Sequence, residues 1–168
     1  MAELIQNKII VEEKKKRDQL MQKGFGEKQG KELVLDLKEG LFLLEKKKID
    51  VKKAGKKLSA KKLREYAAAR EARFYSKYIV FKDLRERGYC VKTGFKFGFD
   101  FRVYPRGKRP GQAHSKQVIK VFTQDDGKSM IELSRMVRLS GNIKTIFTAA
   151  VVDSENDVNY YTIQRITP

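Results

Sequence analysis

The stretch that decides the fold is Phe95-Lys96-Phe97-Gly98-Phe99-Asp100-Phe101-Arg102-Val103-Tyr104. Apolar residues recur along it at every second position, and this period is typical of a β-strand with one buried face. We therefore predict a strand over 95–103. Its phenylalanines should face a core, while Asp100, Arg102 and Tyr104 should lie on the opposite face.

Further strands are predicted on both sides of this stretch, at 89–92, 116–122, 143–152 and 158–166. Between the second and third lies Ser129-Met130-Ile131-Glu132, a capping box that predicts the start of a helix. This helix should turn Met130, Leu133 and Val137 inward and end at Gly141. An acidic turn over 153–157 joins the last two strands.

The N-terminal part of the chain predicts a small α/β module. Its apolar runs favour strands within 4–11 and 33–37 and a buried helix over 40–45 that ends in three lysines, where cations are favourable. Ser59 is expected to cap a third element, a helix that extends to Arg70, and another helix should follow over 74–88. The chain is therefore predicted to be α+β, with an N-terminal domain at 1–70 and a C-terminal domain at 71–168.

Composition points to a polyanionic partner. The 168 residues include 38 lysines and arginines against 21 acids, a net charge of +17. Nucleic acid is the first expectation and an anionic membrane surface the second, because clustered cations release counterions from phosphates. No apolar run approaches the ~18–20 residues of a membrane span. Cys90 is the single cysteine and the first residues lack a signal-peptide pattern, so we expect a reducing, cytoplasmic location.

Three polar residues stand where predicted strands meet loops, a common place for chemistry on a rigid scaffold. Tyr104 follows the alternating strand, and His114, the only histidine, comes ten residues later. Lys144 comes thirty residues after His114, at the predicted start of the strand that follows the capped helix. An unperturbed histidine titrates near pH ~6.5, which suits proton transfer at neutral pH. Taken singly, each of the three also fits an ordinary packed or solvated residue.

Several segments resemble the archaeal tRNA-intron splicing endonucleases: 78–89, 92–104, 113–115 and 150–153, and more loosely 35–45. The resemblance implies a restriction-endonuclease-like mixed-sheet catalytic domain without a metal site or other cofactor, after a small N-terminal α/β module. It implies a catalytic triad of Tyr104, His114 and Lys144. Residues 140–145 depart from the family's usual run of adjacent basic residues.

The resemblance also implies the reaction. The ribose 2′-OH of precursor tRNA would attack the adjacent phosphate at a bulge-helix-bulge junction, leaving 2′,3′-cyclic phosphate and 5′-hydroxyl ends. Tyr104 would act as base, His114 as acid and Lys144 as the cation that stabilises the phosphorane. Asp100 is one carboxylate suited to a metal ion, but Val118 stands two residues before Lys120, where a metal-dependent nuclease would need a second acid.

Recognition and assembly complete the expectations. Arg135 and Arg138 are candidates to clamp an unstacked base, with ordinary surface arginines as the alternative, and four more cations would contact phosphates: Arg102, Arg106, Lys108 and Arg109. By resemblance the chain acts in a four-subunit assembly, as a homotetramer or as a heterotetramer with a structural subunit. Three acids would dock on a neighbouring subunit: Asp153, Glu155 and Asp157. The rival functions are a non-catalytic RNA-binding module and a metal-dependent DNA nuclease.

Overall fold

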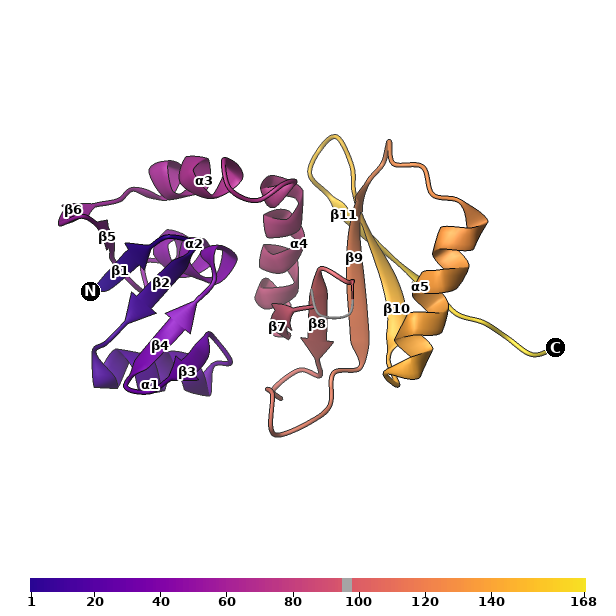
Figure 1. Cartoon of the computed structure of the whole chain (residues 1–168), viewed down its shortest axis with the longest axis horizontal. Coiled ribbons are helices and arrows are strands. Elements are labelled where there is room, and N and C mark those ends of the chain that lie inside the picture. Colours follow the sequence, from indigo (N-terminus) through magenta and orange to yellow (C-terminus); the bar gives the residue numbers. More distant parts are fainter. Residues whose placement is uncertain (95–97) are drawn as a thin grey trace. The chain divides into compact units, whose positions relative to one another are not determined.

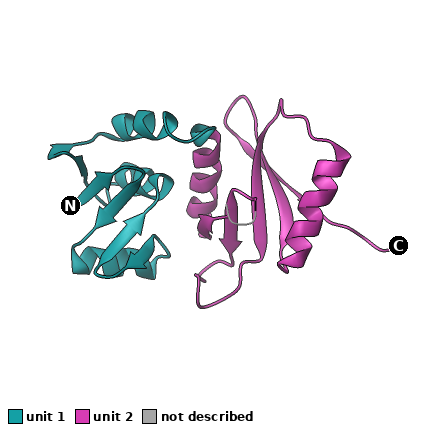
Figure 2. Cartoon of the chain, in the orientation of Figure 1, with its two compact units in different colours: residues 1–75 teal, residues 76–168 magenta. Residues whose placement is uncertain are grey.

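The computed structural model describes residues 1–94 and 98–168 and falls into two compact units, Met1–Tyr75 and Ser76–Pro168 (Figure 2). Each unit packs helices on a mixed β-sheet (Figure 1), which confirms the predicted α+β class. The domain limits predicted from the sequence, 1–70 and 71–168, stay a prediction. No helix among the described residues has the length and apolar character needed to span a membrane.

The N-terminal unit is built on a six-stranded sheet in the order β3-β4-β2-β1-β5-β6. Its strands are β1 (Ala2–Ile5), β2 (Lys8–Val11), β3 (Glu27–Gln29), β4 (Glu32–Leu35), β5 (Val51–Lys53) and β6 (Lys56–Lys57). Its helices are α1 (Lys14–Gln22), α2 (Leu37–Glu45) and α3 (Ala60–Ala68). β1 and β5 are parallel, and the other neighbouring strands are antiparallel.

Local sequence fixes where these helices begin. The Asp36 carboxylate accepts the N–H of Glu39 at 2.8 Å, and the Glu39 carboxylate accepts the N–H of Asp36 at 3.1 Å, so the two residues form a capping box for α2. Ser59 accepts the N–H of Lys62 at the start of α3, as predicted. A Cβ atom at Gly40 would stand 2.0 Å from Ile9 Cδ1, so glycine allows α2 to lie close to β2.

The C-terminal unit has a five-stranded sheet in the order β11-β10-β9-β8-β7. Its strands are β7 (Cys90–Thr93), β8 (Phe101–Tyr104), β9 (Gln117–Thr123), β10 (Ile146–Val152) and β11 (Val158–Ile163). Its helices are α4 (Phe74–Glu86), whose first turn straddles the division between the units, and α5 (Met130–Asn142). Only β9 and β10 are parallel, and α5 is the crossover between them.

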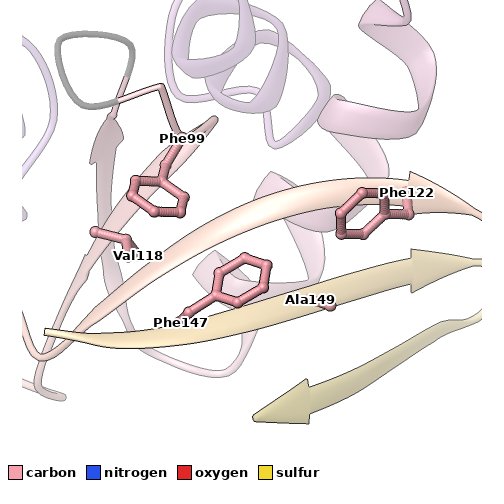
Figure 3. Packing of buried hydrophobic residues seen from close by; sticks show 5 residues of the cluster. All are labelled: Phe99, Val118, Phe122, Phe147 and Ala149. Atoms are coloured by element: carbon pink, nitrogen blue, oxygen red, sulfur yellow. The ribbon is translucent and has the colours of Figure 1, made fainter. Parts of the chain in front are cut away.

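Helices cover both faces of this sheet (Figure 1). On one face Phe81 of α4 packs against Phe101, with 6.2 Å between ring centroids. On the other, Leu133, Met136 and Val137 of α5 pack on a cluster drawn in Figure 3: Phe99, Val118, Phe122, Phe147 and Ala149. Because both faces are buried, the strands read as apolar runs rather than as a simple alternation.

The alternating stretch forms a shorter strand than predicted. β8 begins only at Phe101, and Phe95 and Phe97 lie outside the described residues. Phe99 is buried as predicted but precedes the strand, because the N–H of Asp100 donates to the Ile119 carbonyl at 2.8 Å and the Asp100 carboxylate accepts the N–H of Val121 at 2.7 Å. Tyr104, predicted to lie opposite a buried face, is itself buried.

Other boundaries also differ from the predictions. Met130 is 74% exposed in the first turn of α5 instead of facing inward, and the helix ends at Asn142 rather than Gly141. β10 begins at Ile146, so Lys144 lies before the strand. β11 ends at Ile163, because its last partner on β10 is Phe147 and no β10 residue remains to pair beyond Ile146.

Candidate active site

Three chain connections meet at one end of the C-terminal sheet. β8 and β9 are antiparallel, so the end of β8 lies beside the start of β9. β9 and β10 are parallel, so the start of β10 lies there as well. Tyr104 is the last residue of β8, His114 comes three residues before β9, and Lys144 comes two residues before β10. The topology therefore gathers the three predicted residues at the same sheet end, which Figure 1 shows at its lower edge.

Backbone hydrogen bonds of Lys116 tie these connections together. The Lys116 N–H donates to the Val103 carbonyl at 3.0 Å, and the Lys116 carbonyl accepts the N–H of Ile146 at 3.0 Å. One residue thus joins the segment of Tyr104 to the segment of Lys144, and His114 is only two residues from that link. Among the described residues, no hydrogen bond joins the side chains of Tyr104, His114 and Lys144.

Tyr104 combines a buried ring with an available hydroxyl. Only 6% of the residue is exposed, and its backbone pairs with Cys90 of β7. Within the described ranges its hydroxyl has no hydrogen-bond partner, yet it is not among the side-chain oxygens sealed from solvent. A rigidly held phenol that keeps its oxygen free can accept or donate a proton to a bound substrate.

His114 lies in an exposed loop that has its own internal order. The Lys108 N–H donates to the Pro105 carbonyl and the Gln112 N–H donates to the Arg109 carbonyl, both at 3.0 Å. Gly107 and Gly111 take positive φ values of 72° and 89° at these two turns, which favours glycine there. The loop delivers an exposed imidazole to the sheet end just before β9 begins.

Lys144 sits in an exposed turn directly after α5 with a φ of 54°, a left-handed conformation that is unfavourable for lysine. The turn is held by two bonds to the carbonyl of Ser140, from the Thr145 N–H at 2.9 Å and from the Thr145 hydroxyl at 3.0 Å. The Ser140 hydroxyl in turn donates to the Val137 carbonyl at 2.7 Å. Lys144 also lies at the C-terminal end of a helix, where the partial negative charge favours a cation.

Asp100 is occupied by cations of the protein itself. Its carboxylate lies 3.7 Å from the Lys77 ammonium and 3.8 Å from that of Lys120, in addition to its bond from Val121. Within residues 1–94 and 98–168, no three side chains of histidine, cysteine, aspartate or glutamate gather in a way that suits a metal ion.

Comparison with known proteins connects this geometry to a family. Residues 74–160 match the family model for the tRNA intron endonuclease catalytic C-terminal domain, and residues 1–64 match the model for the tRNA intron endonuclease N-terminal domain. The first match alone covers more than half of the chain. This chain belongs to the tRNA intron endonuclease family. The predicted resemblance is thereby confirmed, and all three candidate residues lie inside the catalytic-domain match.

Similar proteins called tRNA-splicing endonuclease come from several archaea. The chain is 37% identical over 136 residues to the one from Methanothermobacter thermautotrophicus, covering 81% of this chain and 79% of that protein. It is 40% identical over 142 residues to the one from Thermococcus onnurineus, covering 84% and 81% respectively. A longer relative from Methanococcoides burtonii is 35% identical over 98% of this chain, which spans 46% of that protein.

The predicted RNA-binding arginines of this family member occupy different settings. Arg102 is half-buried, and its Nε donates to the Thr93 carbonyl at 2.9 Å, so part of its guanidinium is already engaged. Arg106, in the loop after Tyr104, lies over the Tyr89 ring at 5.0 Å from the centroid. Arg135 and Arg138 are exposed on α5, and Arg138 is one turn nearer than Arg135 to the helix end that leads to Lys144.

The acidic turn lies at the other end of β10, away from the three candidate residues. Asp153 holds this turn together, because its carboxylate accepts the N–H groups of Glu155 and Asp157, both at 2.9 Å. Glu155 and Asp157 are exposed. The three acids therefore do not have equal roles, since one of them shapes the turn that presents the other two.

Sequence reasoning missed Thr145 and Ser140, which hold the Lys144 turn. The pattern was available, because Ser140 and Thr145 flank the predicted end of the helix, and hydroxyl side chains there can bond to the backbone. Nothing in the sequence alone showed that Lys144 adopts a left-handed conformation, since the expected strand start at 143 placed it in extended backbone.

Proposed function

We propose that this chain is the catalytic subunit of a tRNA-splicing endonuclease that cuts precursor tRNA at bulge-helix-bulge junctions and releases the intron. The meeting of Tyr104, His114 and Lys144 at one sheet end is the observation that carries this proposal. Membership of the tRNA intron endonuclease family and the similar archaeal proteins named tRNA-splicing endonuclease support it.

The proposed chemistry uses the substrate's own nucleophile and no metal ion. The ribose 2′-oxygen attacks the adjacent phosphorus while Tyr104 takes the hydroxyl proton. The bond from phosphorus to the 5′-oxygen breaks, and His114 gives that oxygen a proton. Lys144 stabilises the negative charge that develops on the phosphorane. The products are a 2′,3′-cyclic phosphate and a 5′-hydroxyl.

Tyrosine is a weak base at neutral pH, because a free phenol titrates near pH ~10. Bringing a lysine to the same sheet end as Tyr104 supports its role, since a nearby cation favours the phenolate. The exposed setting of His114 supports an acid role, because an exposed imidazole can recover its proton from solvent between turnovers.

Substrate binding and assembly form part of the same proposal. Arg135 and Arg138 would hold an unstacked bulge nucleotide, and Arg106 with its neighbours would contact phosphates. Glu155 and Asp157 would dock on a basic surface of a neighbouring subunit, within a homotetramer or a heterotetramer. The exposed position of these five side chains is what supports the assignment.

The test is cleavage of a bulge-helix-bulge precursor tRNA in the presence of EDTA. We expect the wild-type chain to make two cuts with cyclic phosphate ends, and His114→Ala to lose about 10²- to 10⁴-fold in rate, the usual contribution of a general acid or base. Gln112→Ala, an exposed neighbour in the same loop, should cleave normally. Both variants should bind the RNA with unchanged affinity.

Two results would contradict the proposal. Full cleavage by His114→Ala would remove the histidine from the mechanism, and loss of wild-type cleavage in EDTA would show that a metal ion is needed. Binding of the RNA without any cleavage by the wild-type chain would instead favour the non-catalytic RNA-binding module.

A further inference from the structure

A two-stranded hairpin at one edge of the N-terminal sheet places like charges opposite each other. Lys52 pairs across the strands with Lys57, and Lys53 pairs with Lys56, on either side of a turn at Ala54-Gly55. Like charges in directly opposed positions of an antiparallel pair are destabilising. Lys57 is neutralised by Asp50 at 2.7 Å, but no carboxylate among the described residues pairs with the other three lysines.

The nearby helix α3 adds an aromatic ring that binds two cations. The Tyr66 hydroxyl donates to the Gln6 carbonyl at 2.8 Å, which fixes the ring. The Lys53 ammonium lies 4.2 Å from the ring centroid, and the Arg70 guanidinium carbon lies 3.4 Å from it. In the described part of the chain neither cation has a carboxylate partner.

This arrangement leaves hydrogen-bond donors available for an anion. Arg70 uses one terminal nitrogen to donate to the Tyr66 carbonyl at 3.1 Å. A guanidinium that stacks on an aromatic ring still presents the N–H groups on its edge, and their spacing matches two phosphate oxygens. Two cations held on one ring also repel each other, and an anion bound between them would relieve that repulsion.

The N-terminal unit as a whole has the charge of a nucleic-acid-binding module. Residues 1–75 hold 21 of the 38 lysines and arginines but only 12 of the 21 acids. A hollow of about 730 Å³ beside the hairpin has four lysines and two acids in its wall: Lys16, Lys47, Lys48, Lys57, Glu13 and Asp50. The excess of positive charge therefore continues from the hairpin into the neighbouring surface.

We propose that Lys52, Lys53, Lys56, Tyr66 and Arg70, the hairpin surface, bind the phosphate backbone of substrate RNA outside the splice junction. This inference rests on the proposed function for the identity of the RNA. Lysines on an edge strand also prevent sheets from pairing edge to edge, and that role accounts for Lys56. It does not account for Arg70 stacked on Tyr66 of a helix, whereas cations interleaved with an aromatic ring are typical of RNA-binding surfaces.

The experiment compares two full-length triple variants that remove equal charge. The hairpin variant is Lys53→Gln, Lys56→Gln and Arg70→Gln. The control variant is Lys8→Gln, Lys28→Gln and Lys31→Gln, whose positions lie on β2, on β3 at the opposite edge of the same sheet, and in the turn after β3. The probe is a precursor tRNA with 2′-deoxynucleotides at both splice sites, and its dissociation constant is measured from 50 to 300 mM salt.

We expect the hairpin variant to bind about tenfold more weakly near 150 mM salt and to lower the slope of log affinity against log salt by about 2 to 3, since each lost phosphate contact removes close to one unit. The control should change both quantities much less. Single-turnover cleavage at saturating enzyme should be equal in wild type and hairpin variant. Urea unfolding should show the hairpin variant to be at least as stable as wild type, because repulsion has been removed, and Arg70→Gln alone provides a milder second variant.

Equal affinity in wild type and hairpin variant would overturn the inference, and so would an equal loss in the control. Sedimentation of the wild-type chain with phosphatidylserine vesicles, combined with unchanged RNA affinity in the hairpin variant, would assign the surface to membranes instead. Absence of cleavage by the wild-type chain would contradict the proposed function, while the binding comparison would still test the hairpin surface.

Discussion

The turn that carries Lys144 offers a sharp test of the candidate site. Thr145 makes two bonds to the Ser140 carbonyl, one from its backbone and one from its hydroxyl at 3.0 Å. Thr145→Val keeps the shape of the side chain and the backbone bond and removes the hydroxyl bond alone. The Ser140 carbonyl therefore remains satisfied in the variant, which avoids the large cost of a buried unpaired oxygen.

The size of the effect follows from two opposing energies. A left-handed conformation costs a non-glycine residue about 1–2 kcal/mol, and a neutral hydrogen bond contributes a net ~0.5–1.5 kcal/mol. The hydroxyl bond thus offsets much of the cost at Lys144. Losing ~1 kcal/mol shifts the balance between this turn and its alternatives by about fivefold. We expect kcat to fall by about 2- to 10-fold with KM unchanged, since no substrate contact is removed.

The assay is single-turnover and steady-state cleavage of the precursor tRNA, alongside urea unfolding. Thr145→Ser restores the hydroxyl and should restore most of the rate. Ser129→Ala is the matched control, because it removes the cap at the opposite end of α5, with a typical cost of ~1 kcal/mol. That control should lose stability without losing rate. A wild-type rate in Thr145→Val, or an equal loss of rate in Ser129→Ala, would refute the link between this turn and the reaction.

Two further predictions concern the last strand and the acidic turn. The Tyr160 hydroxyl donates to Asp83 at 2.6 Å, and burial followed by this carboxylate raises the pKa of Tyr160 above its ordinary value. Because the folded pKa lies above the unfolded pKa of ~10, the stabilisation is complete below pH ~10 and is lost as the pH rises further, so wild type should lose unfolding free energy above pH ~10 more steeply than Tyr160→Phe; parallel urea-unfolding profiles from pH 7 to 11 would contradict this. In the acidic turn, Asp153→Asn keeps an oxygen that can accept the N–H groups of Glu155 and Asp157, so light scattering should show wild-type assembly for Asp153→Asn but dissociation for Glu155→Ala; equal dissociation of both variants would mean that the charge of Asp153 itself makes the contact.

Local signals in the sequence predicted the helices well, because their causes are local. The capping hydroxyls of Ser59 and Ser129 act within three residues, and both predicted caps are confirmed. Strand limits were predicted less well, because distant residues determine them. β8 begins at Phe101 since Asp100 bonds to Val121, 21 residues away, and β11 ends at Ile163 since its partner strand ends.

The candidate site divides in the same way. The positions of Tyr104 and His114 at strand ends follow from periodicity and turn residues that any reader of the sequence can find. The setting of Lys144 does not, because its left-handed turn depends on how Thr145 folds back on Ser140. Burial of Tyr104 was also beyond the pattern, since alternation predicts one covered face and helices cover both faces of this sheet.

The convergence of the three residues is a property of strand order rather than of side-chain contacts. An antiparallel pair, β8 with β9, next to a parallel pair, β9 with β10, brings one strand end and two strand starts together whatever the connections contain. The two backbone bonds of Lys116 then fix the register of all three. Extra residues inserted at the loop tip, near Lys108, would leave Tyr104 and Lys144 in place, and His114 would stay tethered two residues before Lys116. The fold thus holds the site at strand ends and leaves the loop tip free to vary with the RNA.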